Sequence, residues 1–239
     1  MKSKCDGASQ FYDRELDRIK GLAWLPWVGA AVPTIANRRR ILIVGESHYS
    51  TAADPIFTKG GGDKEFTRRM VEKFAVRRTQ TNPTFENIGK VLLGDWPTEH
   101  AALWSALSFY NFVQRPMHAR AERPAHGDWV TGWAVFLKVL AVVQPSHCIF
   151  IGVESSHAFA RMMEQCKTSY EPIQHAAKIR RTWARTAKVW LGRKAVGLTF
   201  VRHCGQHFSW RDWHEFLKPR CATSLSALKR TQTHWPFFD

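Results

Sequence analysis

Four short polar segments hold most of the side chains in this chain that could do chemistry. Each follows directly on an apolar run, and together they contribute two carboxylates, several histidines, three amides and a set of hydroxyls. Side chains of these types can bind a ligand through hydrogen bonds and move protons on it. The segments are residues 45–50 (GESHYS), 111–117 (NFVQRPM), 152–159 (GVESSHAF) and 202–210 (RHCGQHFSW).

Three residues in these segments could act directly on a ligand. His203 can donate a hydrogen bond to an oxyanion that develops in a transition state, although a histidine in this position could equally cap the core. Asn111 offers one acceptor and two donors, which suits the edge of a pyrimidine, but an Asn after a strand often forms a turn. Glu46 could orient a water molecule, or it could hold its own loop through backbone N–H groups.

Aromatic side chains accompany these groups. His48 could serve as a base or contact a phosphate. Tyr49 could stack on a nucleic-acid base, or it could be a half-buried structural residue. In the loop that follows His203, Phe208 could wedge into a duplex or pack as a helix staple.

Two other enzyme classes use similar residues. A serine hydrolase would use Ser47 with His203 as its base, but Tyr49 stands where the G-x-S-x-G elbow needs its second glycine. A metal-dependent nuclease would need a cluster of ligands, although no H-E-x-x-H pattern is present. The candidates for that cluster are His203, His207, His214 and Glu215. The five cysteines show no C-x-x-C spacing, which argues against a zinc ribbon, a thioredoxin-like motif and a four-cysteine iron–sulfur cluster.

A strongly basic balance favours a polyanionic partner. The 239 residues contain 35 Lys and Arg against 20 Asp and Glu, which gives a net charge of +15. Residues 172–211 contribute nine of these cations and no Asp or Glu. The spacing predicts a helix over 174–191 with Lys178, Arg181, Arg185 and Lys188 on one face. An all-basic face of this kind suits nucleic-acid phosphates, and a protein that only binds DNA would also explain the charge.

Four apolar runs predict the strands that position these residues. They cover 41–45, 107–113, 147–152 and 196–202. In each, apolar residues follow one another without the alternation expected of a strand with one solvent-exposed face. Helical patterns separate them, at 11–20, 64–76, 85–93, 129–143, 155–165 and 210–217. This alternation predicts an α/β fold, a three-layer sandwich around a four-stranded, mostly parallel sheet. The polar segments then meet at the carboxyl edge of that sheet, where such folds bind ligands.

The whole chain, residues 1–239, is expected to form a single domain, because no linker or repeat interrupts it. The longest apolar stretch is broken by Lys138 and is too short to span a bilayer. The amino-terminal segment lacks the apolar core of a secretory signal. We therefore expect a cytoplasmic protein without a membrane partner.

The ordered set of segments resembles the uracil-DNA glycosylase superfamily over roughly residues 36–217. The strand ending in GESHY (45–49) resembles the family's first motif, and Asn111 resembles the Asn that binds the flipped base. Some members follow this Asn with a basic residue and Pro, as Arg115 and Pro116 do here. The stretch PSHCIFIGVESSHAF (145–159) resembles the third strand and helix start, and FVRHCGQHFSW resembles the strand that ends in His, here His203.

This resemblance implies a DNA glycosylase that extrudes a base and excises it without a cofactor or metal, acting as a monomer. The catalytic candidates are Glu46, His48 and His203. The residues expected to contact the base are Gly45, Ser47, Tyr49 and Asn111. Together with the basic segment, the expected DNA contacts are Arg115, Ser155, Ser156, Arg181, Arg185, Gln206, His207 and Phe208.

The chain departs from the family pattern at two points. Ser47 stands where the best-known branch has an Asp that orients the attacking water. Cys204 and Gly205 replace the Pro-Ser that usually follows the His. The resemblance therefore implies base excision, but it does not identify the residue that activates the attacking water.

The substrate base is expected to be larger than uracil. Residues 51–106 exceed what a short crossover needs, which predicts a helical insertion over the pocket mouth, with Trp96 and Trp104 available to cover a sugar ring. Some superfamily members remove hypermodified cytosines, such as glucosylated 5-hydroxymethylcytosine, from phage DNA, which makes antiphage defence the leading expectation. Against it, Tyr49 would obstruct a substituent at C5. The alternative is a packing cap on an enzyme that removes plain uracil in base-excision repair.

Overall fold

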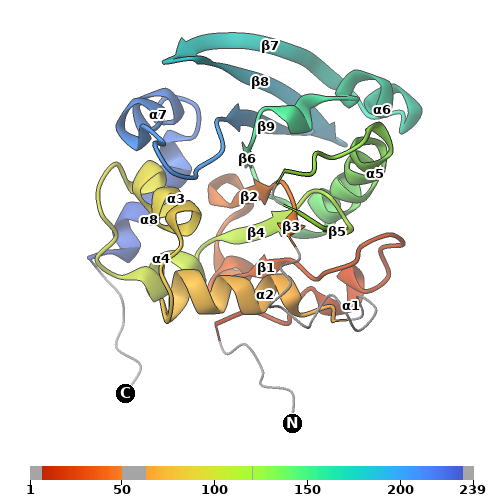
Figure 1. The fold of residues 1–239 in the computed structure, drawn as a ribbon. Helices are drawn as coiled ribbons and strands as arrows, with labels where there is room; N and C mark the ends of the chain where they lie inside the picture. Colours follow the sequence, from red (N-terminus) through yellow and green to blue (C-terminus); the bar gives the residue numbers. More distant parts are fainter. Residues whose placement is uncertain (1–6, 50–62, 120, 234–239) are drawn as a thin grey trace.

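The computed structural model describes residues 7–49, 63–119 and 121–233. Its main sheet has seven strands in the order β1–β4–β2–β6–β9–β8–β7, from β1 near the bottom of Figure 1 to β7 at the top. These strands are β1 (Trp27–Val28), β2 (Ile41–Gly45), β4 (Ser108–Asn111), β6 (His147–Ile151), β7 (Tyr170–Ile179), β8 (Thr182–Leu191) and β9 (Lys194–Val201). A small second sheet pairs β3 (His48–Tyr49) with β5 (Pro116–Met117).

The four strands predicted from the sequence form the parallel centre of the main sheet. β2 pairs in parallel with β4 on one side and with β6 on the other, and β6 pairs in parallel with β9. The α/β class is therefore confirmed. The expected four-stranded sheet is too small, because β1 adds antiparallel to β4 and the β7–β8 hairpin adds antiparallel to β9.

The central strands are apolar throughout because helices cover both of their faces. In β2, Leu42 and Val44 belong to one core cluster, whereas Ile41 and Ile43 belong to the other. The cluster around Leu42 packs against α1 (Asp13–Leu16), α5 (His126–Val143) and α6 (Phe159–Gln165). On the opposite face lie α2 (Phe66–Val71) with its π-helical continuation (Glu72–Val76), α3 (Pro83–Leu93), α4 (His100–Ser105), α7 (Trp210–Leu217) and α8 (Ala222–Thr231). Among the described residues, no helix has both the length and the hydrophobicity to cross a membrane.

The helix predicted over 174–191 is wrong, and the region is the β7–β8 hairpin. Its two strands join through a tight turn in which Arg180 has a φ of 56°, in the left-handed region. Pairing with the core decides the outcome, because Ala187 and Val189 of β8 lie opposite Leu198 and Val196 of β9 and are buried. The basic residues therefore do not share a helical face. The ladder between β7 and β8 also shifts register twice, between Glu171 and Gln174 and between His175 and Ala177.

The predicted insertion at 51–106 is helical over the part that the structure describes, since it supplies α2, α3 and α4. Residues 51–62 lie outside the described residues. Trp104 is fully buried, and its backbone oxygen accepts a hydrogen bond from Trp27 Nε1. Trp96 is exposed and lies under the ammonium of Lys90.

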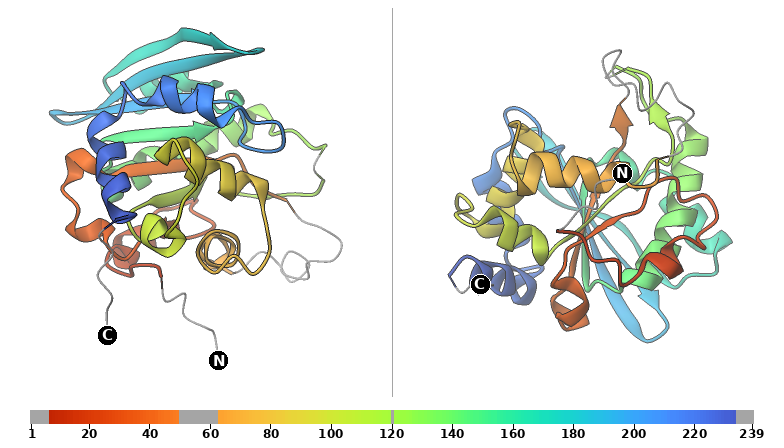
Figure 2. Two further views of the ribbon diagram at one scale, coloured as in Figure 1. Left: turned by 90° about the vertical axis from the view of Figure 1, so that its left-hand side faces the viewer. Right: turned by 90° about the horizontal axis from the view of Figure 1, so that it is seen from below.

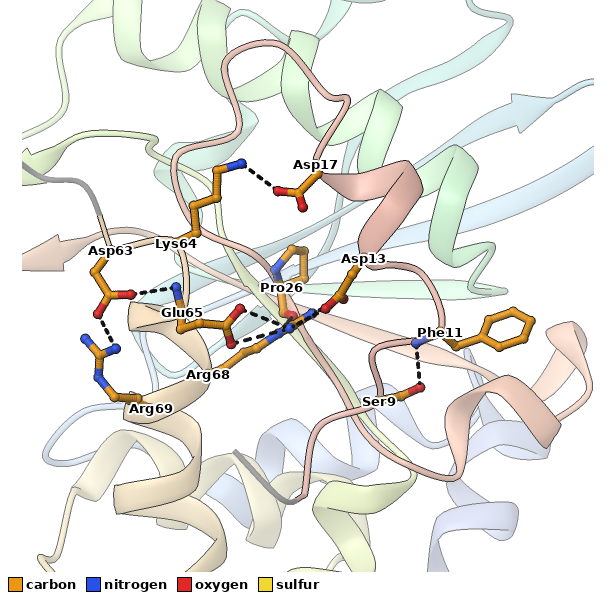
Figure 3. A network of polar contacts seen from close by, with 10 residues as sticks. All are labelled: Ser9, Phe11, Asp13, Asp17, Pro26, Asp63, Lys64, Glu65, Arg68 and Arg69. Carbon is orange, nitrogen blue, oxygen red and sulfur yellow. Dashed lines mark hydrogen bonds and ion pairs between the residues drawn. The ribbon is translucent and has the colours of Figure 1, made fainter. Parts of the chain in front are cut away.

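A buried guanidinium attaches this helical segment to the amino-terminal part of the chain (Figure 3). Arg68 of α2 is only 1% exposed, and its Nη2 lies 2.5 Å from Asp13 Oδ1. Its Nη1 contacts Glu65 Oε1 at 3.3 Å, and its Nε donates to the carbonyl oxygen of Pro26 at 2.9 Å. Because three donors of one planar group are used, Arg68 fixes α2 relative to both α1 and the approach to β1.

Replacement of Arg68 by Met should lower the free energy of unfolding by about 3 kcal/mol, because it leaves the Asp13 carboxylate and the Pro26 carbonyl without their donor. Arg69→Met is the matched control, since Arg69 on the same helix pairs with Asp63 where both side chains are about one third exposed. That control should cost under ~1 kcal/mol. Urea unfolding measures both values, and equal losses would contradict the role of the buried group.

Candidate active site

The strand order places a ligand site between the ends of β2 and β6. After β2 the chain adds β4 on one side, and it then crosses to add β6 and β9 on the other side. Parallel sheets bind ligands at such a switch point, beyond the carboxyl ends of the strands. A cleft of about 1860 Å³ opens at this edge. It is lined by residues that follow all four central strands, as the sequence predicts.

Eight of the predicted site residues line this cleft, and the other seven do not. Those in its lining are Gly45, Glu46, Ser47, His48, Tyr49, Asn111, His203 and Gln206. Those outside it are Arg115, Ser155, Ser156, Arg181, Arg185, His207 and Phe208.

The amide of Asn111 lies directly over Gly45. A Cβ atom on Gly45 would come within 2.1 Å of Asn111 Oδ1, so only glycine fits at the end of β2. The Asn111 side chain makes no hydrogen bond with any described residue, although Asn111 is buried. Its donors and acceptor are therefore free for a ligand in the cleft.

Glu46 carries its carboxylate across the switch point towards β6. Tyr49 donates its hydroxyl hydrogen to Glu46 Oε1 at 3.1 Å. Burial raises the pKa of the Tyr49 phenol, and the nearby Glu46 carboxylate raises it further. On the far side, Gly152 has a φ of 130°, and a Cβ there would lie 3.5 Å from Glu46 Oε2. A contact of that length would be tolerated, so it is the positive φ that favours glycine after β6.

His203 follows β9 and faces the cleft as a neutral hydrogen-bond donor. Its ring is open to solvent in the cleft, but the surrounding walls desolvate it and lower its pKa, even though Glu46 acts to raise that pKa. Its Nδ1 accepts a hydrogen bond from the backbone N–H of Gly205 at 3.1 Å. A neutral ring that accepts at Nδ1 carries its proton on Nε2, which can therefore donate to a ligand.

A side chain from α3 holds the loop after His203. Asn87 Nδ2 donates to the carbonyl oxygens of Cys204 and Gly205, at 3.0 and 2.9 Å. Since the N–H of Gly205 in turn sets the tautomer of His203, Asn87 is a positioning residue for this histidine. The sequence analysis did not identify it, because nothing local in α3 shows which loop its amide meets.

His48 lies in the lining but is packed as a core residue. Its Nε2 is 2.8 Å from Thr67 Oγ1, and its ring contacts those of Trp24 and Phe66. Burial lowers its pKa to about 3. The structure therefore favours a packing role over the base or phosphate contact that the sequence suggested.

Four of the expected DNA contacts are instead used to hold loops. The guanidinium of Arg115 is 2.7 Å from both Asp128 Oδ1 and Glu122 Oε1. Arg185 reaches from β8 to the carbonyl oxygen of Val153 and to Ser156 Oγ. The hydroxyls of Ser155 and Ser156 donate to the carbonyl oxygens of Gly152 and Val153.

Phe208 is buried, and its ring stacks on that of Trp213 with centroids 6.0 Å apart. This arrangement matches the helix staple rather than the wedge. Gln206 and His207, its neighbours in the loop, are exposed.

The cleft has further walls that the sequence analysis did not assign. Residues 66–85 form one of them, with Lys73 and Phe74 in the lining. Trp96 and Trp104 are not part of it. The opposite side holds Trp129 and His157, stacked with ring centroids 6.2 Å apart. Additional lining residues near the catalytic candidates are Arg123, Glu154, Thr182 and Arg202.

The structure gives little support to the two competing enzyme classes. Ser47 Oγ is buried without a hydrogen bond to any described residue, so no Ser47–His203 dyad is formed. His214 is buried in α7, where its Nδ1 lies 2.8 Å from the carbonyl oxygen of Val91. No group of three or more metal-ligating side chains gathers in the described part of the chain, so the residues considered for a nuclease do not form a cluster.

Mild acid should destabilise the protein through its buried histidines. Burial lowers the pKa of His48 to about 3 and that of His147 to about 4, whereas both rise to about 6.5 in the unfolded chain. Stability is complete above pH ~6.5 and falls as the unfolded chain takes up protons, by at most about 1.4 kcal/mol per pH unit for each group. His48→Gln should reduce this slope in urea unfolding, and His175→Gln, on the exposed hairpin, should not. An unchanged slope in the His48 variant would refute the assignment.

Comparison with known proteins adds no relationship to this description. No family model matches the chain, and no curated protein is significantly similar to it. The interpretation of the cleft therefore depends on its residues and their geometry.

Proposed function

We propose that this protein is a DNA glycosylase that binds a flipped-out pyrimidine nucleotide and hydrolyses its N-glycosidic bond, acting as a monomer without a cofactor. The observation that carries the proposal is the meeting of three groups in one cleft. They are the neutral ring of His203, the unbonded amide of Asn111 and the carboxylate of Glu46. In that order, they can donate a hydrogen bond to the base, form hydrogen bonds with its Watson–Crick edge, and orient a water molecule.

Base excision requires charge to be stabilised on both sides of the breaking bond. The bonding electron pair leaves with the base, and negative charge collects on its carbonyl oxygen while the sugar becomes cationic. The Nε2–H of His203 is suited to donate to that oxygen. Glu46 would stabilise the cationic sugar and orient the water that attacks C1′. The water oxygen bonds to C1′ as the bond to the base breaks, and the one proton that the water releases is taken up, through solvent, by the departing base.

Asn111 would recognise the base. Its amide presents a donor and an acceptor side by side, which complements the Watson–Crick edge of a pyrimidine. Because the contact with Gly45 leaves no room between strand and amide, the side chain is held in place before the ligand arrives. Such preorganisation lowers the cost of binding the extruded nucleotide.

The electrostatic surroundings support a polyanionic substrate. Lys73, Arg123 and Arg202 all line the cleft, and the chain as a whole has a net charge of +15. Cations around a concave site attract phosphates and speed association. DNA is therefore a better candidate than a free nucleoside.

The size of the cleft supports a bulky base. Sites for small ligands usually measure about 300–1,000 Å³, and this cleft is larger, at about 1860 Å³. Residues 66–85 add a wall that an extended base could contact. We propose a hypermodified cytosine, such as glucosylated 5-hydroxymethylcytosine in phage DNA, as the preferred substrate, which would make the protein an antiphage defence enzyme.

His203→Ala and Asn111→Ala should each slow excision by roughly 10²–10³-fold, because each removes a hydrogen bond that strengthens in the transition state. The assay incubates DNA with the protein in chelator and converts abasic sites to breaks with alkali. His175→Ala, in a histidine on the exposed hairpin, is the matched control and should keep wild-type rates. Wild-type rates in both cleft variants would refute the assignment, and breaks without alkali would indicate a nuclease.

A substrate panel tests the identity of the base. Glucosylated phage DNA, unmodified phage DNA and duplexes with a single uracil are compared in the same abasic-site assay. We expect excision from glucosylated DNA, because the cleft has room beyond the pyrimidine itself. Excision of uracil alone would contradict the modified-base proposal and favour base-excision repair.

A further inference from the structure

A second, smaller cavity lies next to the cleft, at the turn of the β7–β8 hairpin. Its volume is about 590 Å³. The left view of Figure 2 shows the hairpin running along the top of the molecule above the blue helix α7. We call this cavity the arginine pocket, and its lining residues are Arg180, Arg181, Arg202, His207, Phe208 and Ser209.

The arginine pocket carries positive charge that the protein neutralises only in part. Its lining includes three arginines and no carboxylate. Asp212 of α7 pairs with Arg180, at 2.7 Å from its Nε. The side chains of Arg181, Arg202 and His207 make no hydrogen bond or ion pair with any residue that the structure describes. Two exposed guanidiniums therefore line one cavity without a carboxylate of their own, and guanidinium groups bind phosphate oxygens through paired hydrogen bonds.

Backbone geometry and packing fix the two segments that carry these side chains. The hairpin turn places Arg180 and Arg181 side by side, and the ion pair with Asp212 attaches the turn to α7. In the facing loop, His207 has a φ of 59°, and Phe208 is packed on Trp213 as the floor. The pocket is therefore assembled from two segments that are separately fixed to the core.

Arg202 connects the arginine pocket with the cleft, because it lines both. It immediately precedes His203, and the next hairpin residue after Arg181, Thr182, also lines the cleft. A strand whose base occupies the cleft would thus bring a neighbouring phosphate to this pocket. A free nucleoside would leave the pocket empty.

We infer that the arginine pocket is a subsite for a backbone phosphate next to the nucleotide in the cleft, so the substrate is a nucleic-acid strand rather than a nucleoside. This inference rests on the proposed function, and it gives the basic hairpin a role different from a helical phosphate-binding face. Arg181 and Arg202 are its principal contacts. Arg185, although basic and on the same hairpin, is not one of them.

The test measures the salt dependence of binding to a fluorescein-labelled oligonucleotide by anisotropy. Arg181→Gln and Arg202→Gln should each reduce the slope of log K against log salt by about 0.7–0.9, the contribution of one phosphate contact. Arg193→Gln, an exposed arginine at the opposite end of β8, is the matched control and should leave the slope unchanged. An equal reduction in the control, or no reduction in the pocket variants, would overturn the inference.

A second measurement locates the phosphate. Oligonucleotides with one neutral methylphosphonate linkage are compared at successive positions from the target base. One linkage adjoining that base should weaken binding to the wild type, and it should have no further effect on the Arg181→Gln/Arg202→Gln double variant. Equal losses in both proteins would show that the missing phosphate binds elsewhere and would overturn the inference.

These outcomes separate the two proposals. If the wild type excises a base but the pocket variants behave like the control, the phosphate subsite fails and the glycosylase proposal stands. The opposite result is that no base is excised, but the pocket variants reduce the salt dependence and the methylphosphonate linkage weakens binding only when the pocket arginines are present. The glycosylase proposal then fails and the phosphate subsite stands. A third result is that inorganic phosphate displaces the oligonucleotide while the methylphosphonate linkage affects the wild type and the double variant equally. The pocket would then serve a small phosphorylated ligand, which contradicts the inference.

Discussion

The position of β2, hydrogen-bonded to a parallel strand on each edge, decides where chemistry can occur in this protein. Because β4 and β6 run in the same direction as β2, three strand ends stop at one edge of the sheet. Gly45 ends β2 against the amide of Asn111, and Gly152 follows β6 on the opposite side, near the carboxylate of Glu46. The backbone ladder, rather than any flexible loop, therefore sets the spacing between amide and carboxylate.

The sheet determines where His203 lies, but residues from the surrounding helices and loops determine its pKa and its tautomer. Glu46 favours its protonated form, but desolvation by the cleft walls outweighs this attraction and lowers the pKa. The tautomer comes from the opposite side, where Asn87 of α3 holds the loop that carries Gly205. A helix on one face of the sheet thereby determines which nitrogen of the ring faces the ligand.

The sequence predicts the parallel centre of the fold well, because strands buried on both faces leave uninterrupted apolar runs such as residues 41–45. It fails for the β7–β8 hairpin, where Lys178, Arg181, Arg185 and Lys188 recur at helical spacing by coincidence. Only pairing with β9, which is a tertiary interaction, decides between helix and strand there. For the same reason the sequence brings the strand-end residues together but cannot show that Arg115 and Arg185 are already paired within the protein.

Adding this hairpin to the sheet leaves β7 as an edge strand of ten residues. A long open edge presents unpaired N–H and C=O groups on which a strand of another molecule could add. Pro172 removes one such donor, the two register shifts interrupt the regular ladder, and the charge of Lys178 repels an identical neighbour. The hairpin that carries Arg181 at its turn thus also has, along its outer strand, features that protect it against edge-to-edge aggregation.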